Sequence, residues 1–462
     1  MIMGLLIKNA AIVRPDGLFQ GDLLASDGVI VRIDHSITDD TATVFDAGGK
    51  YLLPGGVDVH THFTLDLGAF QASDDFHTGT VAAACGGTTT IVDHPGFGPQ
   101  HCRLGHQIDV YHRLAEKSAI DYSFHGVFQH VDDQVLTDMA DLAEAGITSF
   151  KAYLTYGGKL ADPDLLRILK RARELGIIIC AHCENDAIIA FLTQQMLQSG
   201  NGDPAGHPRS RPDFCEAEAV YRMLALARAA GDAPVYVVHL STALGLEAVR
   251  SARRHGQSNV FAETCTQYLV LDETRYDDPK EGLKYIMSPP LRGQADNQLL
   301  WDGLRTGDID TLATDHCPFF MEKKLSGVGN FTRCPGGAPG VEARMALMFS
   351  EGFMKGRLSL AEVVWSCCTN PARVFGLYPQ KGALMPGSDA DLVIFDPDIE
   401  MTLTKSMLHE NVDYTPYEGF RLKGAPVMTI SRGEVVARNG EFVGTIGRGK
   451  FIKRSLPILP RR

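Results

Sequence analysis

Apolar residues follow two different patterns along the chain, and the change between them divides the sequence into regions. Up to about residue 53, short apolar runs such as LLIKNAAIV and DLLASDGVIVRID are separated by turn-forming residues. An Asp-Gly pair between two apolar runs, as at Asp27-Gly28, is typical of a β-hairpin. The same style returns after about residue 380, in GSDADLVIFDP and VMTISRGEVVARNGEFVG. We therefore expect one small β-domain built from both ends of the chain.

From residue 57 onward, short apolar strands alternate with amphipathic helical segments. The helical segments include 162–176 and 215–231, and the second ends on Gly231, a plausible helix stop. Strands that alternate with helices predict a parallel sheet, and eight such units can close into a barrel. The strand candidates are 57–63, 88–94, 121–127, 149–155, 177–185, 234–241, 260–269 and 309–316.

The two patterns together predict an α/β fold, a (β/α)8 TIM barrel with a small β-sandwich domain built from both chain ends. Residues 1–53 and 376–446 would form the β-sandwich domain, 54–375 the catalytic barrel and 447–462 an extended basic tail. A tail in solvent and an arm packed on a neighbouring subunit are both compatible with the composition of this last segment.

Composition and charge narrow the class of protein. A chain of 462 residues with 44% hydrophobic content can bury one large core and a smaller one. The net charge of -12 argues against nucleic acid or an anionic membrane as the main partner. No signal peptide or membrane-spanning run is recognisable. Ten cysteines without a disulfide-framework spacing predict a reducing cytoplasm.

His60 and His62 are the first candidates for chemistry. Residues two apart in a strand point to the same face, so both imidazoles aim at one point, as in half of a metal site. The alternative is that both are polar residues at the end of a buried strand. Barrel enzymes work at the carboxyl ends of their strands. The candidates near such ends are His60, His62, Lys151, His182, His239 and Asp315.

Each of these residues has a structural explanation when taken alone. His239 could be a hydrogen-bonded core histidine, Asp315 a helix cap and Lys151 half of an ion pair. Six such residues at one end of one barrel favour a functional site instead.

The motifs resemble those of the amidohydrolase superfamily, and within it the dihydropyrimidinase and D-hydantoinase branch. The similarity extends over nearly the whole chain. Its motifs are PGGVDVHTHF (54–63), the segment 74–94, SFKAYLTY, HCEND, VHLS, ETCTQYL, SPPLR, ATDHCPF and GSDADLVIFDP.

The resemblance implies two divalent metal ions in each chain. His60, His62 and Asp315 would hold one ion, and His182 and His239 the other. Lys151 would bridge both as a carbamate formed with carbon dioxide. Zinc is expected, and manganese or iron would suit the same ligands.

The resemblance also implies roles around the metals. Asp315 would transfer a proton, and Tyr156 would donate a hydrogen bond to the developing oxyanion. Main-chain groups at Ser288 and Gly336 would bind the substrate. Gly336 departs from the family, which has asparagine in a Pro-Asn-Gly loop where this chain reads Cys334-Pro335-Gly336-Gly337.

Two loops, 63–73 and 152–160, correspond to those that cover the exocyclic group of the substrate. Ordinary loop packing is the alternative to a gate. The small Ala152 suggests room for a bulky or aromatic group. The possible gate residues are Leu65, Leu67, Phe70, Ala152 and Leu160.

The predicted function is hydrolytic opening of a small cyclic ureide or imide, a hydantoin or dihydropyrimidine, to an N-carbamoyl amino acid. A 5-substituted aromatic D-hydantoin is the expected substrate and a homotetramer the expected assembly. Thr64 stands where dihydroorotases have a carboxylate-binding arginine, which argues against that activity. Allantoinase and a non-catalytic scaffold of the same fold stay open as alternatives.

Overall fold

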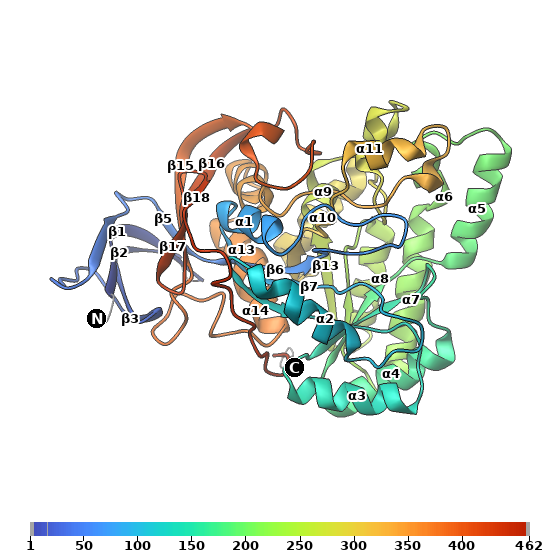
Figure 1. Ribbon diagram of the computed structural model, residues 1–462, viewed down its shortest axis with the longest axis horizontal. Helices are drawn as coiled ribbons and strands as arrows, with labels where there is room; N and C mark the ends of the chain where they lie inside the picture. The colour runs from blue at the N-terminus through green and yellow to red at the C-terminus, as the bar shows by residue number, and fades with distance from the viewer. Residues whose placement is uncertain (1–3, 16, 459–462) are drawn as a thin grey trace.

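Strands from both ends of the chain form one mostly antiparallel sheet (Figure 1). The computed structural model describes residues 4–15 and 17–458. The sheet order is β18-β17-β16-β15-β5-β1-β2-β3, with β4 paired to β1. The strands are β1 (Gly4–Arg14), β2 (Gly17–Ser26), β3 (Val29–Asp34), β4 (Thr43–Asp46), β5 (Tyr51–Pro54), β15 (Leu392–Thr402), β16 (Arg421–Ser431), β17 (Glu434–Arg438) and β18 (Glu441–Phe442).

The two chain ends meet where β5 pairs with β15. Leu52 lies opposite Ile394, and both belong to the apolar cluster that forms the core of this domain. The predicted hairpin at Asp27-Gly28 joins β2 to β3, with φ of 51° and 80° at these two residues. Positive φ at both central residues is the geometry of a two-residue type I′ turn. The prediction of a β-domain from both ends is confirmed.

Parallel strands form the barrel on the other side of the molecule (Figure 1). Because β8 and β9 are two halves of one strand interrupted at His125, the sheets of three and six strands supply eight strand positions. A parallel bridge from Thr61 to His316 closes the ring. The strands are β6 (Gly56–Thr61), β7 (Thr88–Asp93), β8 (Asp121–Phe124), β9 (Gly126–Val127), β10 (Ser149–Tyr153), β11 (Ile178–His182), β12 (Val235–Val237), β13 (Val260–Cys265) and β14 (Thr311–Ala313). The predicted barrel is confirmed.

Helices cover the outside of the barrel. The predicted helix 162–176 is α4 (Asp162–Leu175), which Gly176 ends in the left-handed conformation. The others are α1 (Thr78–Cys85), α2 (His106–Leu114), α3 (Asp133–Glu144), α5 (Asp186–Gln198), α6 (Gly206–Ser210), α7 (Asp213–Ala229), α8 (Ala243–Arg254), α9 (Thr266–Val270), α10 (Gln294–Thr306), α11 (Met321–Lys324), α12 (Arg344–Leu347), α13 (Leu360–Val364) and α14 (Asn370–Val374). None of the helices in the described residues is long and apolar enough to cross a bilayer.

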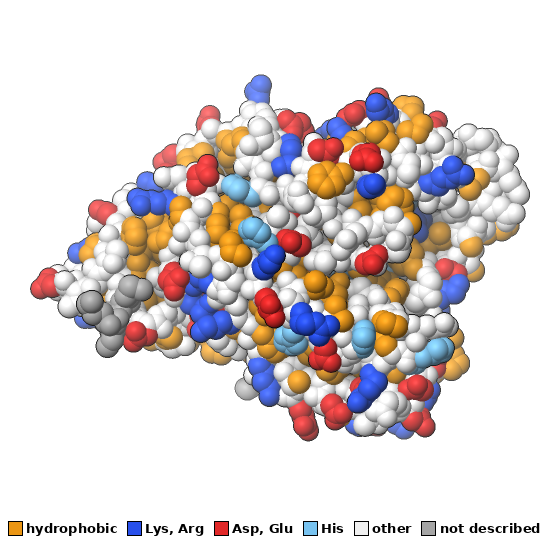
Figure 2. All heavy atoms as spheres, in the orientation of Figure 1, with side chains coloured by type: hydrophobic (Ala, Val, Ile, Leu, Met, Phe, Trp, Pro, Cys, Tyr) orange, Lys and Arg blue, Asp and Glu red, His pale blue; other side chains and the backbone are white. Residues whose placement is uncertain are grey.

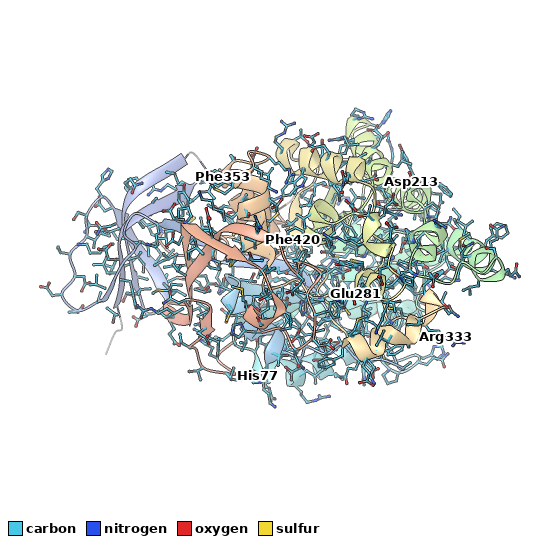
Figure 3. All side chains as sticks on the ribbon, turned by 90° about the horizontal axis from the view of Figure 1, so that it is seen from above. His77, Asp213, Glu281, Arg333, Phe353 and Phe420 are labelled. Carbon is cyan, nitrogen blue, oxygen red and sulfur yellow. The ribbon has the colours of Figure 1, made fainter. Side chains whose placement is uncertain are left out.

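Shorter helical segments complete the connections. The 3₁₀ helices are Ala115–Lys117, Glu273–Tyr276, Glu281–Tyr285, Leu325–Gly327, Phe331–Arg333 and Lys405–Met407, and the π-helical segments are Met348–Met354 and Trp365–Thr369. Phe353 from one π-helical segment lies 6.4 Å from the ring of Tyr51 in β5, and Phe349 lies 4.4 Å from the ring of Phe395 in β15. Phe353 and Phe420 are labelled near this junction in Figure 3. Aromatic packing thus joins the β-domain to the barrel.

One strand prediction is wrong in part. The expected strand 260–269 ends at Cys265, and the chain continues as the short helix α9. A short apolar run does not distinguish a strand from a buried helical turn. Packing decides, because Tyr268 is buried and its hydroxyl donates to Pro289 O at 2.7 Å.

The basic segment at the end of the chain packs on its own barrel. Gly449 N donates to Ser118 O at 2.9 Å, and Phe451 forms a parallel bridge with Tyr122 of β8. Arg454 is 3% exposed, and its Nη2 donates to Phe124 O at 2.6 Å. This part of the segment is therefore held within its own chain, which neither predicted arrangement of the tail describes. Residues 459–462 of the predicted tail lie outside the described residues.

Charged side chains of both signs are interspersed over the face in Figure 2. They lie among polar and scattered apolar side chains on that face.

Candidate active site

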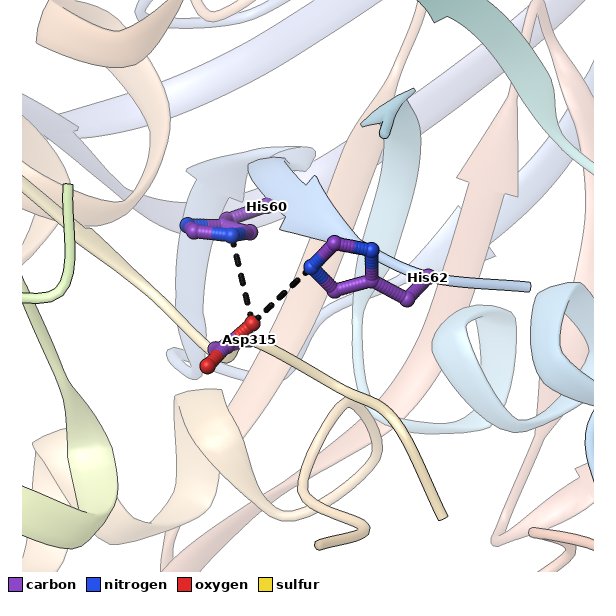
Figure 4. A group of neighbouring side chains, drawn as sticks. All are labelled: His60, His62 and Asp315. Carbon is purple, nitrogen blue, oxygen red and sulfur yellow. Dashed lines mark ion pairs between the residues drawn. The ribbon is translucent and has the colours of Figure 1, made fainter. Parts of the chain in front are cut away.

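His60, His62 and Asp315 come together at the carboxyl ends of the barrel strands (Figure 4). His60 lies in β6, His62 directly follows it, and Asp315 follows β14. Asp315 Oδ1 lies 3.2 Å from His60 Nε2 and 3.1 Å from His62 Nε2. The ligand atoms of the three residues all lie within 4.8 Å of one another. Two imidazoles and one carboxylate form a donor set that suits zinc and similar divalent metals.

The outer nitrogen of each imidazole is already engaged. His60 Nδ1 lies 2.6 Å from Glu263 Oε1, and His62 Nδ1 lies 3.3 Å from His94 O. These contacts orient each ring so that Nε2 faces the common centre. Metal-binding histidines are held in the same way by a carboxylate or carbonyl at the other nitrogen. The residues therefore fit a metal ion on their own geometry.

Three more predicted residues surround this group. Lys151 Nζ lies 3.4 Å from His60 Nε2, and the His239 ring is 5.4 Å from the His60 ring. The His182 ring lies 4.5 Å from the His239 ring. His182 Nε2 is 2.9 Å from Glu184 Oε2, which leaves Nδ1 as its free ring nitrogen. All six predicted ligand residues thus gather at one mouth of the barrel.

Burial and neighbouring charges shift the pKa values of Lys151 and Asp315 in this centre. Burial lowers the pKa of the Lys151 ammonium, and Asp315 and Glu263 offset this only in part. Among the described residues, no carboxylate oxygen lies within 4.0 Å of Lys151 Nζ. Burial alone would raise the pKa of Asp315, but the charge of His60 and the hydrogen bond from His62 lower it to about 2. Burial without a close carboxylate therefore favours the neutral amine of Lys151.

Several residues around the mouth adopt the left-handed backbone conformation. Their φ angles are 59° at Thr64, 68° at Tyr156, 39° at His239 and 53° at Asp315. Such a conformation costs a non-glycine residue on the order of 1–3 kcal/mol and concentrates at functional sites. At His239 and Asp315, which come just after β12 and β14, this turn aims the side chain at the mouth of the barrel.

A cavity of about 850 Å³ opens above this centre, and five of the six residues, all except His60, line it. Tyr156, Ser288 and Gly336, the predicted substrate-binding residues, all line it. A Cβ placed on Gly336 would have Ser288 Oγ as its nearest neighbour, at 4.0 Å. The apolar part of the lining includes Leu65, Leu67, Phe97, Ile189 and Phe331.

Tyr156 sits between the histidines and a buried ion pair. Its ring centroid lies 5.1 Å from that of His182 and 5.5 Å from the Arg211 guanidinium. Arg211 Nη1 donates to Glu184 Oε2 at 2.6 Å. Tyr156 is 39% exposed, yet desolvation by the surrounding cavity wall raises the pKa of its phenol to about 12, against the opposing charge of Arg211. The phenol therefore stays protonated and can donate a hydrogen bond into the cavity.

A family model agrees with this geometry. The model described as "Amidohydrolase family" matches residues 51–436, well over half of the chain. The chain belongs to the amidohydrolase family.

Known proteins resemble this amidohydrolase over its full length. A D-phenylhydantoinase of Escherichia coli is 50% identical over 461 residues, with 99% of each chain covered. The structure of a dihydropyrimidinase from Brevibacillus agri has a TM-score of 0.97 and 42% identity, covering 99% of this chain and 100% of that one. An L-hydantoinase (dihydropyrimidinase) from Arthrobacter aurescens has a TM-score of 0.89 and 34% identity, covering 98% of this chain and 100% of that one. The predicted superfamily and branch are confirmed.

Only part of the predicted gate lies at the cavity of this amidohydrolase. Leu65 and Leu67 line it, whereas Phe70 packs on the apolar cluster around Phe319. Leu160 is buried in the core of the barrel domain.

For Ala152, the prediction of a gate residue is wrong. Side chains alternate along β10, so Lys151 points into the mouth and its neighbour points outward. Ala152 is fully buried, in the same apolar cluster as Leu165 and Ile168 of α4. Its small size therefore carries no information about room for a substrate.

The structure adds residues that sequence reasoning missed. Glu263 is a charged residue inside an apolar strand, a signal that could have identified it as a partner for a histidine. Phe97 follows strand β7 in a Gly- and Pro-rich loop, a position typical of cavity walls in barrels. Arg211 carried no comparable signal. Both ring nitrogens of His94 are buried and have no hydrogen-bond partner in the described part of the chain, and its ring lies 4.3 Å from that of His60.

A second group with metal-ligand atoms consists of Cys85, Glu342 and His409, within 4.8 Å of one another. Glu342 already pairs with His409 Nδ1 at 2.8 Å and accepts from His409 N at 2.6 Å. The hydrogen bond to Glu342 raises the pKa of His409, and burial raises that of the Cys85 thiol. Both shifts favour protonated groups and so oppose metal binding. The group fits a structural ion pair.

Proposed function

We propose that this amidohydrolase opens the ring of hydantoins or dihydropyrimidines by hydrolysis and releases N-carbamoyl amino acids. A 5-substituted aromatic D-hydantoin is the proposed substrate. The observation that carries the proposal is the convergence of six metal-ligand residues below a cavity lined by Tyr156 and Ser288. The related D-phenylhydantoinase supports the substrate class, and the apolar wall that includes Phe97 gives an aromatic substituent a surface to pack on.

Two divalent cations, zinc in the first place, are the proposed cofactors, and manganese or iron would suit the same donors. His60, His62 and Asp315 would hold one, and His182 and His239 the other. Lys151 would bridge them as a carbamate. Its buried amine with a lowered pKa supports this role, because the neutral amine is the form that takes up carbon dioxide.

The cations, when bound, supply a nucleophile from water at neutral pH and polarise the scissile carbonyl. Asp315 would accept the proton of the attacking water and return it to the leaving ring nitrogen. The Tyr156 hydroxyl would donate to the carbonyl oxygen as that oxygen becomes negatively charged. Main-chain groups at Ser288 and Gly336 would hold the imide edge in place for the attack.

The test compares 5-phenylhydantoin, hydantoin, dihydrouracil, allantoin and dihydroorotate as substrates of the metal-loaded protein. We expect 5-phenylhydantoin to give the highest kcat/KM. Preference for dihydroorotate or allantoin would overturn the proposed substrate. Metal analysis should find close to two ions in each chain, and a protein without bound metal or activity would be a scaffold instead.

A separate experiment tests whether Lys151 carries the bridging carbamate. Lys151→Ala should lose activity, and a short carboxylic acid added to this variant should restore part of it, because the acid replaces the missing carboxylate. Activity of Lys151→Ala without such an addition would contradict the bridging role.

The proposal also covers the oligomeric state of the protein and its cellular compartment. We propose a homotetramer, and the exposed aromatic residues Phe191, Phe214 and Tyr221 on α5 and α7 support burial against other copies. Light scattering during size-exclusion chromatography measures the assembly directly. The ten cysteines are free, which supports a reducing cytoplasm as the working compartment.

A further inference from the structure

Behind the substrate cavity lies a buried lysine side chain, Lys324. Lys324 ends α11 and is fully buried. Among the described residues, no carboxylate oxygen lies within 4.0 Å of its Nζ. The ammonium donates instead to three backbone carbonyls, those of Ile286 at 2.8 Å, Pro335 at 2.9 Å and Gly337 at 2.6 Å. An ammonium has three N–H donors, so each one is used.

These carbonyls belong to the two loops that carry the proposed substrate contacts. Ile286 lies two residues before Ser288, and Pro335 and Gly337 flank Gly336 on both sides. Gly337 N also donates to Ile286 O at 3.0 Å, so the two loops meet at that carbonyl. Gly336 has no side chain of its own to fix it. The place of its main chain therefore depends on what holds its neighbours.

We propose that Lys324 is a positioning residue for substrate recognition: it fixes the separation between the Ser288 loop and the Gly336 loop, and with it the main-chain groups that hold the imide edge. The proposal rests on the proposed function, since it assigns a task within that reaction. Lys324 does not line the cavity and touches no reacting atom.

The protonation state of Lys324 should affect how firmly the two loops are held. Burial lowers the pKa of this ammonium to about 8, and the nearby groups that oppose the shift are the thiols of Cys334 and Cys317. The Phe319 ring lies 6.0 Å from Nζ. Above that pH the neutral amine has two N–H donors for three carbonyls. One carbonyl then loses its partner, and the two loops are held less firmly.

The experiment measures kcat and KM of the metal-loaded wild type, Lys324→Met and Lys323→Met. Methionine is unbranched and one atom shorter than lysine, and it has no hydrogen-bond donor. Lys323 is the matched control, because it neighbours Lys324 on α11 and its side chain is 52% exposed. We expect Lys324→Met to raise KM on the order of tenfold, the effect of losing hydrogen bonds to a charged group. We expect kcat to change by less than about threefold and Lys323→Met to behave as wild type.

The second measurement is the pH dependence of KM for dihydrouracil, whose ring nitrogens keep their protons over the range. Wild-type KM should rise from about pH 7 to about pH 9, as Lys324 loses its proton. The KM of Lys324→Met should stay flat over the same range.

Each outcome decides the question. A folded Lys324→Met with wild-type KM, or with lowered kcat alone, would overturn the proposal. If this variant does not fold, the wild-type profile decides, and a flat KM there counts against Lys324. A wild type that opens none of the rings refutes the proposed function and this inference together, whereas unchanged KM in an active enzyme refutes only the inference.

Discussion

At the scale of single residues, the candidate active site depends on carboxylates that lie behind the histidines. Glu263 Oε1 lies 2.6 Å from His60 Nδ1 and accepts from His239 N at 3.0 Å, and Tyr236 donates to its other oxygen at 2.8 Å. One buried side chain thus orients residues proposed for both metal ions. Partners of this kind fix the ring and raise the basicity of the ligand nitrogen.

Glu263→Gln should weaken metal binding about 10–100-fold, the cost typical of losing such a partner. The amide keeps the size of the carboxylate but not its charge. Competition with a chelator measures the affinity. Glu247→Gln, at an exposed position on α8, is the control and should bind metal as wild type. Equal affinity of both variants would show that Glu263 does not support the ligands.

Tyr156→Phe should lower kcat about 10²–10³-fold with little change in KM, as expected for a hydrogen bond made mainly to the developing oxyanion. Steady-state kinetics with 5-phenylhydantoin measures both constants. Tyr378→Phe, at a tyrosine that does not line the cavity, is the control and should leave them unchanged. A rise in KM at constant kcat would instead assign Tyr156 to ground-state binding.

At the scale of elements, short loops after the strands carry the recognition of substrate. The loop around Gly336 departs from the family sequence, yet it keeps the space for a side chain. Gly336 is not among the residues with positive φ, and its nearest neighbour for a Cβ is Ser288 Oγ at 4.0 Å. The backbone there is compatible with the asparagine of the family.

Gly336→Asn should therefore fold normally and unfold at the same or a slightly higher temperature. A side chain at a permissive glycine stabilises by about 0.4–1 kcal/mol through the unfolded chain. KM for hydantoins should change less than about threefold if only main-chain groups bind the imide. Differential scanning calorimetry and steady-state kinetics check the two expectations. A large change in KM would show that the side chain itself takes part in recognition.

At the scale of the whole molecule, a buried charge cluster fastens the β-domain to the barrel. Lys381 Nζ lies 2.6 Å from Asp121 of β8, 2.9 Å from Asp389 and 2.8 Å from Asp391, which precede β15. Arg432 adds a second cation, 3.1 Å from Asp121. Removing one partner from a buried set of charges leaves the others uncompensated.

Lys381→Met should lower stability by about 3–5 kcal/mol, the typical cost of breaking a buried ion pair from one side. Thermal unfolding of the metal-loaded protein measures the loss. Lys117→Met, at an exposed position, should unfold as wild type. Unchanged stability of Lys381→Met would mean that the aromatic contacts alone hold the two parts together.

Much of the fold and of the site follows from local patterns. The change from hairpin-like runs to alternating strands and helices predicted a barrel beside a domain made from both chain ends. The same pattern placed His60, His62, Lys151, His182, His239 and Asp315 at the carboxyl ends of strands. Strand periodicity and barrel geometry are regular, so residue order alone determines where such side chains go. In β10 the alternation of side chains points Ala152 away from the mouth, which contradicts its predicted role in the gate.

The tertiary structure decided the contacts between segments that are distant in the chain. Glu263 reaches His60 across 203 residues, and Lys381 reaches Asp121 across 260. The same is true of three other features. These are the place of Phe97 in the cavity wall, the hydrogen bonds that hold Arg454 on the barrel, and the three carbonyls around Lys324. Such contacts depend on how the barrel closes and how its loops pack on it. A local sequence pattern does not reveal which residues are partners, because the partners come close only once the chain has folded.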